Sequence, residues 1–169
     1  MYQSGNSYNI DFNSCLALQG FNAYKIEPNY GVSQHYSRKD FYKICLATGK
    51  SIIRTAQGVI SLQGTVLFLG HPGVHYSWEL FSGVSLGYGC VFNEMYLSKG
   101  CGSHVLQKLS LLHEKKLYIY QIDREQQYCV IELFEKMIAA QRSHYIFRKE
   151  LIDIYISLLV YEMQKMEFK

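Results

Sequence analysis

Glycine and proline are confined to the first part of the chain, and this distribution constrains the fold more than any other feature. The last of the 13 glycines is Gly102, and the second of the two prolines is Pro72. Before about residue 123, short apolar segments alternate with Gly, Asn and Ser, whereas after it neither Gly nor Pro occurs. Glycine and proline mark turns and interrupt helices. The sequence therefore predicts a turn-rich β region followed by a helical region.

The first region contains seven segments rich in β-branched and aromatic residues, which is the pattern of β-strands. These predicted strands cover residues 21–26, 40–47, 51–56, 59–63, 65–70, 75–81 and 85–92. Glycine or proline separates most of them, for example Gly49, Gly64 and the Pro72-Gly73 pair. Short strands joined by tight turns indicate an antiparallel sandwich or barrel. For residues 98–118 we expect a loop and a short helix or extended arm.

The second region predicts two amphipathic helices. In residues 124–142, apolar side chains recur at three- and four-residue spacing, which places them on one face of a helix. Asp123 fits the N-cap position, and Gln126 fits the reciprocal position of a capping box. After a break at Ser143-His144, residues 147–166 form the second predicted helix.

The apolar stripe of the second helix is wider than the ~100° that docking on one surface requires. Two interpretations stay open. The helix packs entirely within its own domain, or one flank meets the same helix of a second copy in a two-fold dimer. The predicted dimerisation row contains Ile152, Tyr155, Ile156, Leu159 and Met163.

Charge, the N-terminus and the cysteines argue against several classes of protein. The net charge is only +3 and the basic residues are scattered, which does not predict a DNA-binding surface in these 169 residues. The N-terminal residues lack the apolar core of a signal peptide, and no apolar run approaches the ~20 residues that cross a membrane. Five cysteines without a Cys-x-x-Cys motif predict free thiols in a reducing cytoplasm.

His71 and His75 flank the Pro-Gly turn and raise the question of a metal site. A metal-binding barrel of the expected type carries two His and a Glu on one strand and a third His after such a turn. By spacing, these positions fall on Ser37, Lys39, Lys43 and either Tyr76 or His75. A protonated Lys is no ligand, and two His alone make a weak site. We predict no metal, no cofactor and no catalytic residue, with both histidines in the turn or at the rim of a pocket.

Strand alternation predicts a pocket for a small molecule. Side chains two residues apart point to the same face of a strand, so Phe41, Lys43 and Cys45 share one face, as do Tyr76 and Trp78. Tyr88, Cys90 and Phe92 share a face of their strand, and the other face carries Gly87 and Gly89, where a second element can approach closely. The candidate pocket residues are Lys39, Phe41, Lys43, His75, Tyr76, Trp78, Tyr88 and Phe92. The alternative is that Lys43 faces solvent and the aromatic residues form an ordinary core.

Four segments, taken in order, resemble the N-terminal half of AraC-type transcriptional regulators, in the version found in Bacteroidetes. They are RKDFYKICLATGK, GTVLFLGHPGVHYSWEL, GYGCVFNEMYL and the helical segment from IELFEKM to YEMQKM, and the resemblance covers residues 36–166. It implies a mainly β fold, with a cupin-like antiparallel β-barrel in residues 1–122 and a C-terminal two-helix hairpin in residues 123–169 packed on it as one unit.

The resemblance also implies a function. In such regulators the barrel binds a small effector, the helices form a homodimer, and a separate helix-turn-helix domain, missing from these residues, binds DNA. From the position of Lys43 we expect an anionic or polar effector. Two alternatives stay open: a metal-dependent cupin enzyme, and a dimerisation module without a ligand.

Overall fold

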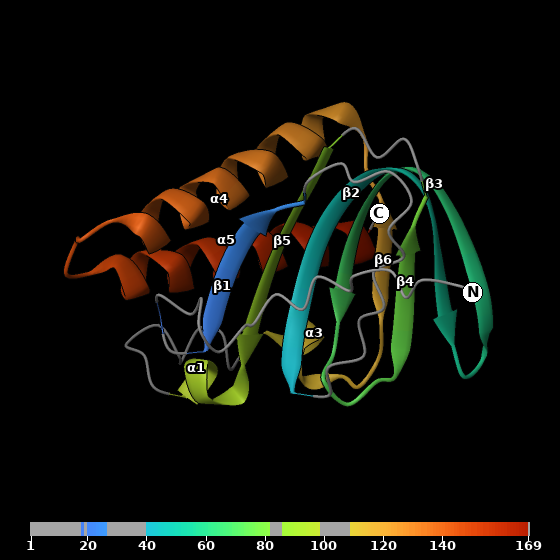
Figure 1. Ribbon diagram of the computed structural model, residues 1–169, viewed down its shortest axis with the longest axis horizontal. Helices are drawn as coiled ribbons and strands as arrows, with labels where there is room; N and C mark the ends of the chain where they lie inside the picture. Colours follow the sequence, from blue (N-terminus) through green and yellow to red (C-terminus); the bar gives the residue numbers. More distant parts are fainter. Residues whose placement is uncertain (1–17, 19, 27–39, 82–85, 99–108, 169) are drawn as a thin grey trace, which may run out of the picture.

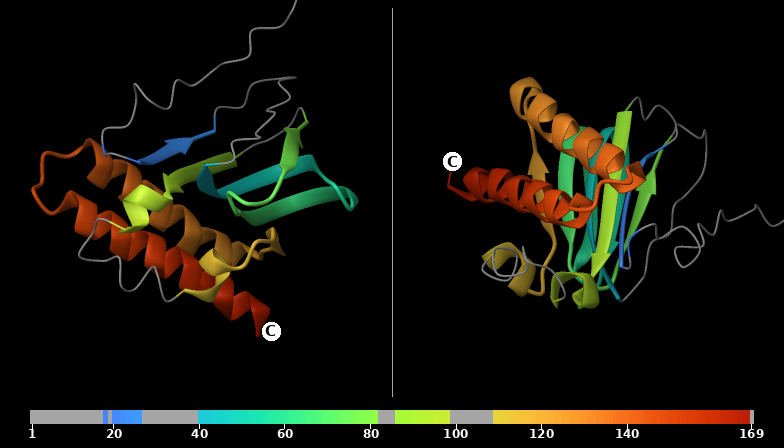
Figure 2. Two further views of the ribbon diagram at one scale, coloured as in Figure 1. Left: turned by 90° about the horizontal axis from the view of Figure 1, so that it is seen from below. Right: turned by 90° about the vertical axis from the view of Figure 1, so that its left-hand side faces the viewer.

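The computed structural model describes residues 18, 20–26, 40–81, 86–98 and 109–168. These residues form two layers, an antiparallel sheet and a pair of long helices that lie along one of its faces (Figure 1). An end-on view shows both long helices on the same side of the sheet (Figure 2, right). The expected antiparallel sheet and helical hairpin are therefore confirmed.

Six strands make up the sheet in the described part of the chain. They are β1 (Phe21–Lys25), β2 (Phe41–Thr55), β3 (Gly58–Gly70), β4 (Tyr76–Leu80), β5 (Leu86–Asn93) and β6 (Tyr118–Gln121). Their order is β1-β5-β2-β3-β6, with β4 paired to β2 outside this path. The described strands do not close on themselves, and strands and helices contribute similar shares of the fold. The expectation of a mainly β, closed cupin-like barrel is thus not confirmed.

β2 and β3 are longer than the sequence predicted. Residues 40–47 and 51–56 were expected as two strands, and so were 59–63 and 65–70, yet each pair forms one continuous strand. Gly49 and Gly64 face each other across the two strands, and both have positive φ angles, 142° and 97°. Glycine accepts such angles without steric cost. Here the two glycines bend the hairpin and do not end its strands.

Besides its pairing with β3, the bent β2 pairs with two further strands along its length. Residues 41–48 pair with β5, and residues 51–55 pair with β4. Lys43 and Ile53 are ten residues apart, which is about 33 Å along a straight strand. Trp78 pairs with Ile53, yet its ring lies only 5.7 Å from Lys43 Nζ. β2 must therefore curl strongly, so that its two ends share one concave side.

The two long helices agree closely with the prediction. α4 (Arg124–Arg142) begins at a capping box, in which Gln126 N donates to Asp123 Oδ1 at 2.8 Å and Asp123 N donates to Gln126 Oε1 at 3.0 Å. α5 (Arg148–Glu167) runs back beside it. Two short helices, α1 (Glu94–Ser98) and α3 (Ser110–His113), complete the described helices. None of the described helices is long and apolar enough to cross a membrane.

The main core lies between the sheet and the two long helices, and it contains the row that was predicted to dimerise. Ile152, Ile156, Leu159 and Met163 are fully buried there, and Tyr155 is partly buried against the same cluster. The prediction of this row as an interface is wrong, because the side chains are already covered by their own chain. This flank of α5 packs within the domain, but the helix as a whole does not, because Ile154, Leu158 and Tyr161 are exposed.

Side chains of α4 tie the helical layer to the edge of the sheet at β1. Gln141 bonds both backbone groups of Ala23: its Oε1 accepts from Ala23 N at 2.7 Å, and its Nε2 donates to Ala23 O at 3.1 Å. Glu135 accepts from the Tyr88 hydroxyl at 2.6 Å and pairs with Lys25 at 2.7 Å. These contacts fix α4 over β1 and β5.

Candidate functional site

The face of the sheet that points away from the long helices carries a second, smaller apolar cluster. It contains Cys45, Ala47, Ile53, Phe68 and Trp78, with Tyr76 packed against it. Lys43 belongs to the same face, since it alternates with Cys45 and its amine lies over the Trp78 ring. We call these seven residues the Trp78 face.

Three of the predicted pocket residues therefore come together: Lys43, Tyr76 and Trp78. The alternative that Lys43 faces solvent is wrong, because its side chain is only 4% exposed. Phe41 has the same parity but lies at the start of β2, where it is partly buried. His75 lies exposed in the β3–β4 turn, and Lys39 lies outside the described residues.

Tyr88 and Phe92 belong to the opposite, helix-side face, so their place in the predicted pocket is wrong. Leu46 pairs with Tyr88, and Tyr42 pairs with Phe92. Paired residues of adjacent strands point to the same face, and Leu46 and Tyr42 belong to the main core. The Tyr88 ring accordingly stacks on Phe134 of α4, with 5.7 Å between the ring centroids.

The glycines of β5 do permit a close approach, as the sequence predicted. Gly87 and Gly89 lie on the Trp78 side of β5, because Gly89 pairs with Cys45. A Cβ atom at Gly89 would lie 2.6 Å from the Tyr24 ring. Tyr24 of β1 thereby reaches Cys45, a neighbour that strand alternation alone did not identify. In the sequence, the Gly87-x-Gly89 pattern indicates that another element can approach β5 closely, but it does not indicate that Tyr24 is the residue that does so.

Lys43 places an amine in a nearly dry, aromatic environment. Burial lowers the pKa of Lys43 to about 8, and the neighbouring Cys45 opposes this change only in part. Burial also raises the pKa of the Cys45 thiol, against the effects of Lys43 and Tyr24. Cys45 is therefore a neutral thiol at neutral pH, and Lys43 is the one of the two groups that readily changes its charge.

Aromatic rings form the wall beside this amine. The ring centroids of Phe68 and Trp78 are 5.6 Å apart, and those of Phe68 and Tyr76 are 5.0 Å apart. Trp78 is 1% exposed, and its indole Nε1 donates no hydrogen bond within the described structure. A buried donor without an acceptor costs free energy. The Trp78 face thus offers a cation and an unused donor next to an apolar wall, which is suited to a ligand with a polar or anionic group.

His71, which precedes the Pro72-Gly73 turn, contacts other residues of its own chain. His71 is buried, and its Nδ1 accepts a hydrogen bond from Gly73 N at 2.9 Å. Its ring packs edge-on against Tyr42, and burial lowers its pKa. Among the residues that the structure describes, no three His, Cys, Asp or Glu side chains are grouped as metal ligands would be.

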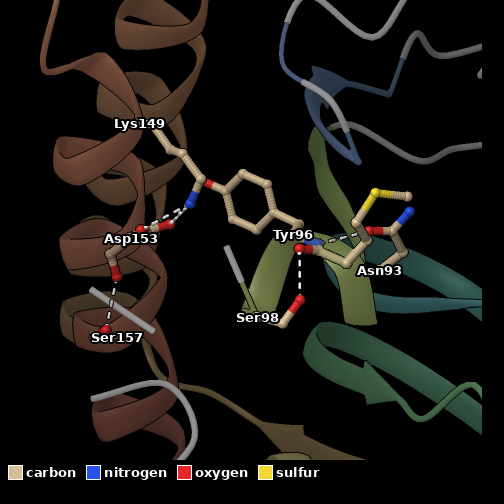
Figure 3. Close-up of polar contacts among 7 residues, drawn as sticks. Asn93, Tyr96, Ser98, Lys149, Asp153 and Ser157 are labelled. Carbon is tan, nitrogen blue, oxygen red and sulfur yellow. Dashed lines mark hydrogen bonds and ion pairs between the residues drawn. The ribbon is translucent and has the colours of Figure 1, made fainter. Parts of the chain in front are cut away.

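A second buried polar cluster, which the sequence analysis did not identify, joins α5 to α1 (Figure 3). Asp153 of α5 is buried and pairs with Lys149 at 3.1 Å. The Lys149 amine lies 4.0 Å from the centre of the Tyr96 ring, which comes from α1. Burial raises the pKa of Asp153. The signal in the sequence is a lone Asp in an apolar helix, four residues after a Lys.

The exposed flank of α5 carries a different apolar row from the predicted one. Ile154, Leu158 and Tyr161 are about half exposed, at 52%, 47% and 48%, and Leu151 precedes them in the same row. The spacings of three, four and three residues place the four side chains along one line of the helix. We call Leu151, Ile154, Leu158 and Tyr161 the outer row of α5.

The chain matches no model of a known protein family, and no curated protein matches it in sequence. Among solved structures, it is similar to apo ToxT from Vibrio cholerae, with a TM-score of 0.54 and 17% identity over 86% of this chain and 55% of that chain. A fatty-acid-bound ToxT gives a TM-score of 0.46 and 12% identity over 86% and 51% of the two chains.

The AraC-like transcriptional activator CuxR gives a TM-score of 0.47 and 11% identity, over 84% of this chain and 49% of that chain. The chain thus spans about half the length of these proteins. At these identities the similarity establishes the fold alone, and the chain shares that fold with the matched part of apo ToxT.

Proposed function

We propose that this chain is the effector-sensing and dimerising region of an AraC-type transcription regulator. The motifs of the sequence and the fold shared with apo ToxT support the class. In this proposal the chain is not an enzyme, and DNA is contacted by a separate helix-turn-helix domain. The regulator then acts in the cytoplasm, where its DNA is found.

The effector would bind at the Trp78 face. The observation that carries this assignment is the buried Lys43 amine, 5.7 Å from the centre of the Trp78 ring on a sheet that curls around it. Burying a cation in an apolar environment lowers stability. A ligand that supplies a negative charge or strong acceptors there would recover part of that free energy.

The polar group of the effector is expected to be anionic or rich in acceptors. With a pKa of about 8, Lys43 is mostly protonated at pH 7, so it attracts an anion, while Trp78 Nε1 can donate to a second oxygen. Phe68 and Tyr76 would contact an apolar body. An unsaturated fatty acid, such as the one present in a ToxT structure, is one probe of this kind.

Dimerisation is assigned to the outer row of α5. A line of half-exposed apolar side chains along a long helix is unusual on a monomer's surface. A two-fold contact, in which each α5 meets its copy, would cover the row on both chains at once. The row replaces the buried one predicted from the sequence.

The test is a thermal-shift series at pH 7 with an unsaturated fatty acid, aromatic acids and neutral sugars. A ligand that binds only the folded state raises the melting temperature. We expect acids to stabilise the wild type and to lose most of that effect in Lys43→Met. Lys50→Met is the matched control, because Lys50 lies on the same strand but is exposed, and it should respond like the wild type.

Two outcomes would contradict the proposal. If acids stabilise wild type and Lys43→Met equally, the effector does not use this amine. If the purified protein contains one equivalent of a transition metal, the metal-dependent cupin enzyme becomes the better interpretation. A protein that dimerises but responds to no ligand would favour the dimerisation module.

A further inference from the structure

The His71 imidazole takes part in the hydrogen bonding of the turn between β3 and β4. Its Nδ1 accepts from Gly73 N at 2.9 Å, and the His71 carbonyl accepts from Val74 N at 3.0 Å. The side chain is only 8% exposed, and its ring packs edge-on against Tyr42. A ring nitrogen that accepts a hydrogen bond carries no proton, so the neutral ring holds its single proton on Nε2.

A second proton can bind only at Nδ1, which is the atom that accepts from Gly73. The imidazolium ring has two donors and no acceptor, so protonation leaves two N–H groups facing each other across the turn. Burial against Tyr42 also disfavours a charged ring, whereas water would solvate that ring if the turn opened. Protonation therefore acts against the closed turn in two ways, by removing a hydrogen bond and by burying a charge.

We propose that His71 is a pH-sensitive switch in the β3–β4 turn, which is closed while the ring is neutral and opens when Nδ1 takes up a proton. The turn leads directly into β4 (Tyr76–Leu80), the strand that carries Tyr76 and Trp78. Opening the turn thus acts on the Trp78 face from within the fold. The switch requires no effector, so it goes beyond the proposed function and does not depend on it.

The contacts on either side of the turn show how it positions β4. A Cβ atom at Gly70 would overlap with the Tyr76 hydroxyl, so Tyr76 lies across the last residue of β3. The Tyr76 ring also packs on Phe68, with 5.0 Å between the ring centroids. Because the closed turn brings the start of β4 back over the end of β3, opening it should move Tyr76 away from Gly70 and expose Trp78 to solvent.

Charged groups from other elements set the pH at which the switch acts. Burial lowers the pKa of His71 below its ordinary 6.5. Glu94 of α1, which accepts from the Tyr42 hydroxyl at 2.7 Å, opposes this change, whereas Lys115 and His113 reinforce it. The closed turn is therefore fully favoured above pH 6.5 and loses stability below it. The ratio of open to closed turn should rise by up to about tenfold for each pH unit below 6.5.

Trp78 provides the readout, because it is the only tryptophan of the chain and is 1% exposed. Acrylamide quenching of its fluorescence is measured from pH 7.5 to pH 5, and far-ultraviolet circular dichroism shows whether the fold persists. We expect quenching of the wild type to increase toward pH 5 while the dichroism stays constant. Nitrogen NMR of the imidazole rings should show that neutral His71 carries its proton on Nε2.

His71→Asn separates the titration from the hydrogen bond, since an Asn Oδ1 can accept from Gly73 N in an Asx turn but does not titrate. Its quenching should stay constant over this pH range. His75→Asn is the matched control, because it removes an exposed histidine from the same turn, and it should respond like the wild type.

An acid response that persists in His71→Asn would overturn the inference. A neutral His71 ring that is protonated on Nδ1 would do so as well, and this result comes from the wild type alone, whether or not the variant folds. Wild-type quenching that stays constant down to pH 5, or that rises only together with a loss of dichroism, would also contradict a local switch.

Discussion

Lys43 is a cation that folding transfers from water into an apolar layer, so its protonation is linked to the stability of the fold. Its pKa is about 8 in the folded chain against an ordinary 10.5. Between these values the unfolded chain holds a proton that the folded chain has released, so stability rises with pH. Below pH 8 both states are protonated, and the full cost of burying the charge applies.

Lys43→Met is therefore expected to stabilise the protein at pH 7 by about 2 kcal/mol. This is less than the free energy that corresponds to the whole change in the pKa of Lys43 on folding. The gain should shrink as pH rises from 8 toward 10.5. Urea unfolding at pH 7 and pH 10 measures both. Lys50→Met, an exposed control, should stay within about 0.5 kcal/mol of the wild type. A gain that is equal at both pH values would contradict the buried charge.

Asp153, which lies on α5, makes the stability of the fold depend on pH in the opposite direction. Burial raises its pKa above the ordinary 3.8, so the folded chain retains a proton that the unfolded chain loses, and stability falls as pH rises through this window. Asp153→Asn removes the titration and should gain stability relative to wild type from pH 3.8 upward. Lys149→Met should destabilise instead, because it leaves the buried carboxylate without its ion-pair partner. pH-dependent thermal unfolding of both variants tests the signs.

For residues of the candidate site, the sequence predicted the face of the sheet correctly only where alternation along a single strand determines it. The alternation within β2 and β4 correctly grouped Lys43 with Cys45 and Tyr76 with Trp78. The same rule could not show that Tyr88 and Phe92 lie on the other face, since that depends on the register of β5 against β2. Register is set by packing and turn geometry across the sheet. The cluster around Asp153 was missed because Tyr96, whose ring contacts the Lys149 amine, comes from another element.

Among the elements, β5 has a tight steric limit where β1 packs beside it. A Cβ atom at Gly89 would lie 2.6 Å from the Tyr24 ring, and contacts this short force a neighbour to move. Gly89→Ala should therefore destabilise the fold by about 1–3 kcal/mol. In a Tyr24→Ala background the same change should cost clearly less, because the ring is gone. Urea unfolding of the four variants supplies the coupling, and additive effects would argue against a direct clash.

Local sequence signals predicted a helix or strand well where residues that are close in the sequence determine its structure. The bounds of α4 and its capping box follow from residues 123–142 alone. Gly49 and Gly64 misled the strand prediction, because glycine ends a strand in some contexts and bends it in others. Whether they end or bend a strand is decided by their pairing across the hairpin. This pairing joins residues that are 15 positions apart in the sequence. β6 and α1 were missed because residues 94–121 carry no clear periodicity.

For the whole molecule, Leu158 and Leu159 separate assembly from folding. They are adjacent on α5, but Leu158 is 47% exposed and Leu159 is fully buried. Leu158→Glu should convert a dimer to a folded monomer, whereas Leu159→Glu should destabilise the fold by about 3 kcal/mol or more, because it buries a charge. Sedimentation gives the assembly state and circular dichroism the fold. A wild type that sediments as a monomer at tens of micromolar removes the proposed interface.

The amino-acid sequence predicted the order of the two layers, a β region followed by a helical hairpin. Glycine and proline occur only before the boundary between these two regions. It did not predict how far the sheet closes. Closure depends on the tilt and stagger of strands that meet across long separations, and the strong curl of β2 becomes visible only through the short distance between Lys43 and Trp78.

The two hydrogen bonds between Gln141 and Ala23 also affect how the molecule behaves in a crowded solution. β1 is the terminal strand of the sheet order, and a terminal strand is a template for the extended chain of another molecule. The Gln141 amide presents one donor and one acceptor to β1, as a neighbouring strand would. The Gln141 side chain thereby covers part of the edge at which the strand of another molecule would otherwise pair.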